Sequence, residues 1–176
     1  MSESRAREKL AEARVSAKWT VRRRIRPGDV GALTRLHGVL YAGEYGYDET
    51  FEAYVAGGLA EFVASFRPGR DRIWLAEEGG RLIGSVAIVS RSATVAQLRW
   101  FLVEPGFRRR GLGGRLLVAA VRFCRSRRYK SIFLWTTSDL EEAARLYERF
   151  GFRRTEERTH RIWGKRITEQ RYDLTL

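Results

Sequence analysis

Cysteine is almost absent from the sequence, which contains one residue of this type, Cys124. A single cysteine cannot form an internal disulfide bond, and this usage is typical of a reducing compartment, so we expect a cytoplasmic location. Cys124 falls among the apolar positions of an expected helix. It is therefore predicted to be buried and unreactive, and not a nucleophile.

Long apolar runs are also missing. No stretch approaches the roughly 20 apolar residues of a membrane-spanning helix, and the polar N-terminus does not resemble a signal peptide. Membrane association is therefore not expected, and the sequence shows no internal repeat and no low-complexity linker. A length of 176 residues is sufficient for one domain with a core of its own.

Acidic residues are outnumbered, with 21 Asp and Glu against 34 Lys and Arg, which gives a formal net charge of +13. Such a charge attracts anions in general, and nucleic acid is one of them. The basic residues are spread over every segment and are not gathered in one tail. Specific nucleic-acid binding is therefore not expected.

The apolar pattern predicts alternating strands and helices, with residues 1–18 as a helical or frayed leader and residues 19–176 as the folded domain. Strands are expected over residues 19–25, 73–77, 82–90, 95–103, 131–136, 152–156 and 170–176. Helices are expected from residue 29 to residue 43 or 46, over residues 49–66, after residues 111–114, and from a capping box at 138–141 to Gly151. The connection that contains Trp163 and Gly164 is left without a prediction.

Some positions allow a more specific prediction. Three adjacent arginines, residues 22–24, put a charge on each face of the first strand and indicate an edge strand. Asp29 is expected to cap the helix that follows, and His37 is interpreted as a packed residue of that helix and not as a catalytic one. The apolar face of the second helix is expected to contain Phe51, Val55, Leu59, Phe62, Val63 and Phe66.

The segment from Glu44 to Glu49 mixes acids, aromatic residues and a glycine between two expected helices. One interpretation is a helix–helix connection in which Asp48 caps the second helix. The other is a wall of a substrate site, with Tyr45 contacting the substrate and a nearby carboxylate available for chemistry. The sequence supports both interpretations equally.

The stretch from Gln97 to Arg128 contains the clearest functional signal. An apolar strand is stopped by Pro105 and Gly106, three arginines follow at 108–110, and glycines at 111, 113 and 114 open a helix. Glycines allow a ligand to approach the backbone, the first turn of a helix has free N–H groups, and arginines add forked donors. The stretch therefore predicts a phosphate-binding loop, although it matches neither the Walker loop nor the dinucleotide fingerprint.

The residues from Arg108 to Gly113 resemble the Arg/Gln-x-x-Gly-x-Gly/Ala signature of the GNAT superfamily of N-acetyltransferases. A second GNAT-like motif joins Leu146 and Tyr147 to Gly151 and Phe152. The resemblance extends over roughly residues 20–176 and looks closest to acetyltransferase domains fused to MarR-type regulators, here free-standing. It implies an α+β fold with a mixed, mostly antiparallel central sheet and helices on both faces.

The resemblance also implies a cofactor and a reaction. Acetyl-CoA, with no metal, would be held by the loop, and its pantetheine arm would lie along Leu102 and Val103. Tyr147 would be the general acid in a direct transfer of the acetyl group to the primary amine of a small molecule, amino acid or peptide. The residues that would bind the cofactor in the loop are Arg108, Arg109, Arg110, Gly111, Leu112, Gly113 and Gly114.

The chain departs from the family pattern at two positions. Leu140 stands where the family has an asparagine, and Arg99 stands near the usual position of a glutamate base. The base is therefore open, with Glu44 and then Glu49 as candidates. Arg99 would grip an acceptor carboxylate, or else it would pair with one of these glutamates and only shape the cleft.

A different class of function stays open beside the enzyme. The alternative is a non-catalytic GNAT-like module that senses an acyl-CoA or docks on nucleic acid. A homodimer is also left open, and the sequence does not identify the acceptor.

Overall fold

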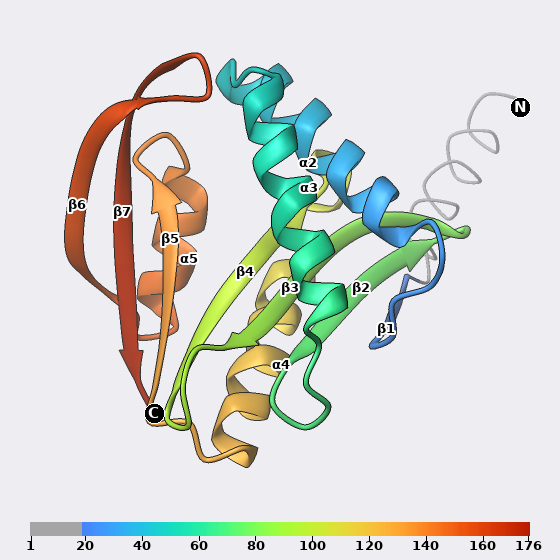
Figure 1. Cartoon of the computed structure of the whole chain (residues 1–176), viewed down its shortest axis with the longest axis vertical. Coiled ribbons are helices and arrows are strands. Elements are labelled where there is room, and N and C mark those ends of the chain that lie inside the picture. Colours follow the sequence, from blue (N-terminus) through green and yellow to red (C-terminus); the bar gives the residue numbers. More distant parts are fainter. Residues whose placement is uncertain (1–18) are drawn as a thin grey trace, which may run out of the picture.

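The computed structural model describes residues 19–176, so the prediction of a leader over residues 1–18 lies outside the described residues. The described part forms one seven-stranded sheet with the strand order β1-β2-β3-β4-β5-β7-β6 (Figure 1). In chain order the elements are β1 Thr20–Arg22, α2 Asp29–Tyr45, α3 Glu49–Ala64, β2 Arg72–Glu78, β3 Arg81–Ser90, β4 Val95–Val103, the 3-10 turn η1 Pro105–Phe107, α4 Leu112–Ser126, β5 Ser131–Thr137, α5 Glu141–Arg149, β6 Arg153–Ile162 and β7 Lys165–Thr175.

The sheet is mostly antiparallel, and β4 and β5 form its parallel pair within the described residues. Helices α2 and α3 cover one face, and α4 and α5 lie on the other (Figure 1). This arrangement confirms the predicted α+β class with a mixed sheet between two helical layers.

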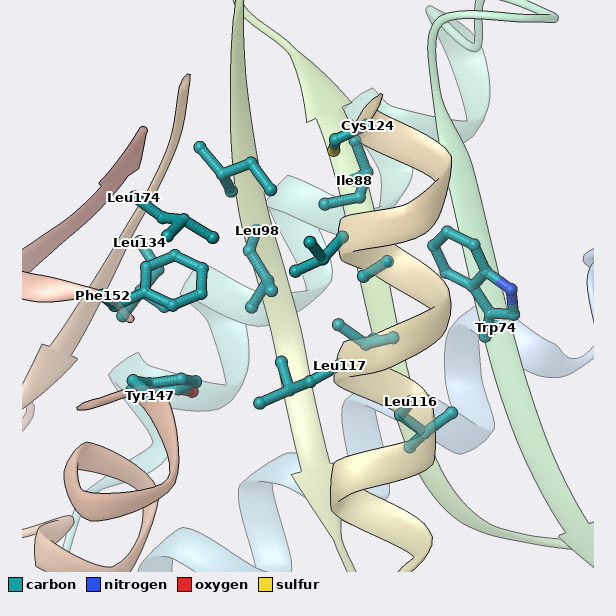
Figure 2. Close-up of a cluster of buried hydrophobic side chains, with 14 of the residues drawn as sticks. Trp74, Ile88, Leu98, Leu116, Leu117, Cys124, Leu134, Tyr147, Phe152 and Leu174 are labelled. Atoms are coloured by element: carbon teal, nitrogen blue, oxygen red, sulfur yellow. The ribbon is translucent and has the colours of Figure 1, made fainter. Parts of the chain in front are cut away.

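Two apolar clusters hold these layers together. The larger one packs Leu116, Leu117 and Cys124 of α4 against β2 to β5, and it continues to Phe152 beside α5 (Figure 2). The second packs α2 and α3 on the opposite face through residues such as Leu33. Burying a leucine side chain contributes about 1.5–3 kcal/mol, so both layers are firmly attached. Cys124 is buried as predicted, and burial raises the pKa of its thiol to about 12.

Strand β4 contains a bulge at Trp100, which has a φ of 47°. The pairing with β3 shifts between Ser85 and Ala87, and the Ser85 hydroxyl donates to the Trp100 carbonyl at 2.6 Å. The bulge reverses the alternation of side chains along the strand. Phe101 therefore packs on the α4–α5 face, whereas Arg99 lies beside Gly58 of α3.

The apolar sequence of β4 predicts a regular strand, in which alternation would put Gln97, Arg99, Phe101 and Val103 on one face. This prediction is wrong, because the bulge puts Arg99 and Phe101 on opposite faces.

Strands β4 and β5 stay together over three paired positions, which end at Gln97 and Phe133. Beyond these residues the two strands diverge, as Figure 1 shows. The backbone of β4 from Leu98 to Val103 therefore has no strand partner on the β5 side within the described residues. This divergence opens the middle of the sheet next to the loop that follows β4.

The N-terminal part differs in detail from the prediction. Strand β1 lies at the edge of the sheet as predicted, but it is shorter than expected. Asp29 is the first residue of α2, and Gly28 is the cap. The Asp29 carboxylate is bonded to the Arg22 guanidinium and the Arg26 backbone N–H, so it cannot cap the helix. The end of α2 at Gly46, with a left-handed φ of 69°, agrees with the prediction.

Helix α3 buries a narrower face than predicted. It ends at Ala64, where Ser65 forms the C-cap, so its apolar stripe stops one turn early. Val63 and Phe66 are 43% and 39% exposed, and their assignment to the buried face is wrong. The remaining members of the predicted face are buried.

The C-terminal hairpin is the largest difference from the prediction. Strands β6 and β7 run to a two-residue turn at Trp163 and Gly164, well beyond the expected limits. Almost every side chain of the edge strand β6 is exposed, so the apolar alternation that marks a strand in sequence is missing. The capping box at 138–141 is also wrong, because Leu140 precedes α5 and no side chain caps it.

Candidate active site

The loop after β4 presents free backbone donors. Gly111 has a φ of 81° and Arg109 a φ of 59°, so both adopt the left-handed conformation. The N–H groups of residues 109–111 donate to no backbone carbonyl of the described chain, and the first intrahelical bond of α4 joins the Arg115 N–H to the Gly111 carbonyl. The amides of this turn and of the first turn of α4 therefore form a site for an anion.

The Arg108 side chain fixes this loop in place. Its Nε donates to the Val103 carbonyl at 3.0 Å, and its terminal nitrogen donates to the Glu44 carboxylate at 2.8 Å. Arg108 thus ties the loop to the end of β4 and to α2. Glu44, the first candidate for a base, is held in this ion pair.

A groove of about 960 Å³ extends from the loop between β4 and α5, and we call it the loop groove. Gly113 fits closely here, because a Cβ atom would meet Phe101 at 3.3 Å and Leu146 at 3.4 Å, and these side chains would have to shift slightly. Gly114 faces open space. The groove is also lined by Leu40, Tyr41, Tyr45, Leu102, Val103, Arg108, Arg109, Leu140 and Arg145, among others.

A second cavity of about 110 Å³ lies between α2, α3 and the diverging strands, and we call it the aromatic chamber. Its aromatic lining consists of His37, Tyr41, Tyr47, Phe51, Tyr54, Trp100, Phe101, Trp135, Tyr147 and Trp163. Tyr41, Phe101 and Leu140 line both cavities. The loop groove and the aromatic chamber therefore meet where β4 and β5 separate.

Tyr147 lies at this junction and is 5% exposed. Its ring packs against Phe101 at 5.7 Å and Phe152 at 6.0 Å, and Figure 2 shows it at the edge of the apolar cluster. Tyr147 lines the chamber, and its hydroxyl forms no hydrogen bond with any group of the described chain. Burial raises the pKa of Tyr147, and the neighbouring Tyr41 adds to this effect, so the phenol stays protonated.

Arg99 lines the aromatic chamber without a carboxylate partner among the described residues. Its guanidinium donates to the Tyr54 hydroxyl at 3.1 Å and lies 4.4 Å from the Trp100 ring centroid. The predicted alternative, in which Arg99 pairs with Glu44 or Glu49, is not observed. A second cation lies near it: burial lowers the pKa of Arg91, and the charge of Arg99 lowers it further.

The segment from Glu44 to Glu49 contains the predicted cap of α3, and two of its tyrosines line the cavities. The Asp48 carboxylate accepts the Thr50 N–H at 3.0 Å and caps α3. Tyr47 lines the chamber, and its hydroxyl is bonded to Thr137 at 2.8 Å. Tyr45 lines the loop groove and not the chamber, whereas Glu49 is exposed and lines neither cavity.

Two chamber residues come from the C-terminal hairpin, which contains no functional motif. Glu169 of β7 is the one carboxylate among the described residues that line the chamber, and it pairs with His160 at 2.8 Å. Trp163 packs on Tyr47 at 5.2 Å and on Phe51 at 4.9 Å, and its carbonyl accepts the Asp48 N–H at 3.2 Å. The turn of the hairpin therefore covers the chamber on the side of the N-terminus of α3.

Comparisons with known proteins agree with this architecture. A family model described as the acetyltransferase (GNAT) family matches residues 40–152. The chain belongs to the GNAT acetyltransferase family. The matched segment contains β2 to α5, and with them the phosphate loop and Tyr147.

Among curated relatives within and around this family, N-acetylaspartate synthetase of Danio rerio is 33% identical over 101 residues, which cover 56% of this chain and 36% of that protein. Mycothiol acetyltransferase of Thermobispora bispora is 38% identical over 87 residues, which cover 49% of this chain and 27% of that protein. The chain therefore spans well under two thirds of either relative.

Solved GNAT structures share the fold. An acetyltransferase from Staphylococcus aureus Mu50 has a TM-score of 0.73 at 17% identity, covering 90% of this chain and 99% of that chain. The yncA protein of Salmonella typhimurium, a structure with its cofactor acetyl-CoA, has a TM-score of 0.67 at 20% identity, covering 92% and 95%. At these identities the likeness concerns the fold.

Over residues 19–176, no helix is long and apolar enough to cross a membrane. The same residues contain no group of three or more histidine, cysteine or acidic side chains placed to bind a metal ion.

Proposed function

We propose that the protein is an acetyl-CoA-dependent N-acetyltransferase that transfers an acetyl group directly to the primary amine of a small molecule, amino acid or peptide. The observation that carries this proposal is the junction of the loop groove with the aromatic chamber at Tyr41, Phe101 and Leu140. A donor in the groove and an acceptor in the chamber would meet there, beside Tyr147. The structural neighbours crystallised with acetyl-CoA support the choice of donor.

The donor would be bound mainly by backbone groups. The free amides of residues 109–111 and of the first turn of α4 suit the pyrophosphate. Leu102 and Val103 pair with β3 but have no strand partner on the β5 side, and that side of β4 suits the pantetheine arm, although the Val103 carbonyl already accepts from Arg108. The Arg108 guanidinium holds the loop against the end of β4 through the Val103 carbonyl, while Arg109 and Arg110 are exposed and contribute charge. Leu140 offers no hydrogen bond, so it would contact the arm only through apolar atoms.

The reaction requires a polarised carbonyl and a protonated leaving group. A backbone N–H of the Leu102–Val103 segment would donate to the acetyl oxygen, and such donors contribute about 10²–10³-fold to the rate. The amine nitrogen then forms the C–N bond as the C–S bond breaks. The departing sulfur would take the Tyr147 proton, and general-acid catalysis of this kind contributes about 10²–10⁴-fold.

The proton that the amine loses needs an acceptor. Glu44 is held by Arg108 and lines neither cavity, and Glu49 is exposed away from both. Glu169 lines the chamber, where its partner is His160. We therefore rank Glu169 before Glu44 and Glu49 as the group that takes this proton, directly or through a water molecule.

Arg99 supports an acceptor that carries an acidic group. It lacks a carboxylate partner among the described residues, and its forked donors fit a carboxylate in two-pronged fashion. The name N-acetylaspartate synthetase of one relative refers to an acetylated dicarboxylic amino acid, which agrees with this choice. The likeness to MarR-fused domains, the cytoplasmic location and the homodimer stay predictions.

Thiol release from acetyl-CoA tests the proposal. The amine panel would contain L-aspartate, L-methionine, tyramine and spermidine, and we expect turnover with the acidic amino acid to exceed that with the polyamine. Arg99→Gln should raise KM selectively for carboxylate-bearing amines. Binding of acetyl-CoA by calorimetry without turnover of any amine would instead favour a non-catalytic acyl-CoA sensor.

A further inference from the structure

Three buried polar atoms without partners belong to residues of the aromatic chamber. They are His37 Nε2, Trp100 Nε1 and the Thr136 hydroxyl, and each lacks a hydrogen bond within the described chain. A buried polar atom without a partner is costly, and native structures pair nearly all of them. All three residues line the same small cavity, so a ligand bound there is the nearest source of the missing partners.

His37 gives the most specific information of the three. The side chain is 3% exposed, and its Nδ1 lies 2.9 Å from the Leu33 carbonyl, one turn earlier in α2. A carbonyl oxygen only accepts hydrogen bonds, so Nδ1 carries the hydrogen and Nε2 presents a lone pair. Burial lowers the pKa of His37 to about 4, so the imidazole is neutral at physiological pH.

We propose that His37 positions the acceptor amine, its Nε2 accepting one N–H of the nitrogen that attacks the acetyl group. The inference rests on the proposed function and deepens it by naming the residue that holds the acceptor nitrogen. The acceptor would be a compact primary amine with an acidic group, held by His37 at the nitrogen and by Arg99 at the anion. The cavity of about 110 Å³ admits only a small group.

The hydrogen balance of the transfer explains why the amine must be primary. A neutral primary amine has two N–H hydrogens; one leaves when the C–N bond forms, and the other stays on the amide product. The retained N–H can donate to His37 before and after the transfer, which fixes the nitrogen lone pair toward the carbonyl. A secondary amine has a single N–H, and the transfer removes it.

Removal of the Nε2 lone pair tests this role. In His37→Phe the ring and its stacking on Tyr41 are kept, and the unpaired polar atom is removed. We expect kcat/KM for the amine to fall by about 30-fold or more, with KM for acetyl-CoA within twofold and the Tm at pH 7.5 unchanged or higher. His37→Gln, which restores an acceptor atom, should recover part of the loss. The control is Val39→Ala, an exposed position of the same helix.

A second experiment compares the most active amine of the panel with its N-methyl derivative. Acetylation rates are measured for both, and ¹⁵N NMR follows the imidazole resonances. The chain contains two histidines, so the His37→Phe spectrum assigns the His37 signals. We expect the primary amine to shift the His37 Nε2 resonance and the N-methyl derivative to be acetylated at least tenfold more slowly. Unchanged kcat/KM for the amine in His37→Phe, or equal rates for the two amines, would overturn the inference.

Failure of the proposed function is distinguishable from failure of this inference. A wild-type protein that binds no acetyl-CoA, or acetylates no amine of the panel, would refute the enzyme itself. Adding the panel amines to the protein while following the ¹⁵N chemical shift of His37 would then still decide whether the chamber binds an amine. The absence of any shift would overturn the inference as well.

Discussion

Two glycines of the loop after β4 are favoured for different physical reasons. Gly111 adopts a φ of 81° that side chains disfavour, although a Cβ atom there would meet nothing within 4 Å. At Gly113 the backbone conformation is ordinary, but a Cβ atom would press on Phe101 and Leu146. The sequence motif therefore combines one preference for a backbone conformation, at Gly111, and one for close packing, at Gly113.

Tyr147 permits a substitution that isolates its proton. Tyr147→Phe keeps the ring against Phe101 and Phe152 and removes a hydroxyl that has no partner in the described chain. We expect kcat to fall by about 10²-fold or more, while acetyl-CoA affinity and Tm barely change. Steady-state kinetics, calorimetry and thermal unfolding of one preparation give the three values. A fully active Phe variant would remove Tyr147 from the reaction.

Three glutamates can be compared by one substitution each. Glu44→Gln, Glu49→Gln and Glu169→Gln remove the charge and keep the size. If Glu169 takes the amine proton, its variant should lose about 10²-fold or more in kcat. Glu44→Gln should mainly weaken acetyl-CoA binding, because it releases Arg108, and Glu49→Gln should be neutral. A large loss of kcat in Glu44→Gln alone would restore the first candidate of the sequence analysis.

The loop between β4 and α4 depends on the conformation of its glycines. Gly111→Val places a β-branched side chain at a φ of 81°, so the turn must rearrange and its amides lose their common direction. Calorimetry should show a loss of acetyl-CoA binding of at least about 10²-fold. Gly57→Ala, on an exposed part of α3 with free space around it, serves as the control. Unchanged affinity in the valine variant would move the site elsewhere.

The strands and helices that sequence reasoning identified are those with strong apolar periodicity. Strand β5 follows its predicted limits to within one residue, and α4 begins at the glycines where a helix is expected, because their buried positions repeat at strand and helical spacing. The bulge at Trp100 was not predictable in this way, since it depends on the pairing of β3 with β4 and on the Ser85 hydroxyl.

The site was predictable only where it is local in sequence. The loop of residues 108–114 and Tyr147 follow from short motifs, whereas the chamber assembles side chains from α2, α3, β4, β5 and β7. Glu169 and Trp163 lie on a polar hairpin that has no apolar alternation. His37 was correctly interpreted as packed, but its unpaired Nε2 became visible only with its neighbours in place.

The folding stability of the whole chain should depend on the charge state of His37. Its pKa is about 4 in the folded protein and about 6.5 in the unfolded chain. Between these values the unfolded chain binds a proton that the folded chain excludes. The free energy of unfolding therefore has its full value above about pH 6.5, where His37 is neutral in both states, and it decreases as the pH falls toward 4. From pH 7.5 to pH 5 the loss amounts to about 2 kcal/mol.

Urea unfolding at the two pH values measures this dependence. The difference between wild type and His37→Phe should change by about 2 kcal/mol between pH 7.5 and pH 5, because the other titrating groups are common to both proteins. Val39→Ala should follow the wild type. Parallel behaviour of wild type and His37→Phe would show that the imidazole is not held neutral.

The net charge of +13 acts over the entire surface. We expect any binding to nucleic acid to be weak and to decrease steeply with salt, because a protein that neutralises phosphates releases counterions. Fluorescence anisotropy with a labelled duplex of mixed sequence at 50 and 200 mM salt gives the slope. Tight binding of one sequence at physiological salt would contradict this expectation and would support a docking module.

The C-terminal hairpin has a consequence for how this protein could diversify. The matched family segment ends at Phe152, so Trp163 and Glu169 lie beyond it, although both line the chamber. On the proposed function, the residues that bind the donor lie within the matched family segment, and part of the acceptor site lies outside it, in the hairpin of β6 and β7. We therefore expect substitutions at Trp163 or Glu169 to alter the preference among amines while acetyl-CoA affinity stays unchanged, so that the two specificities can evolve separately.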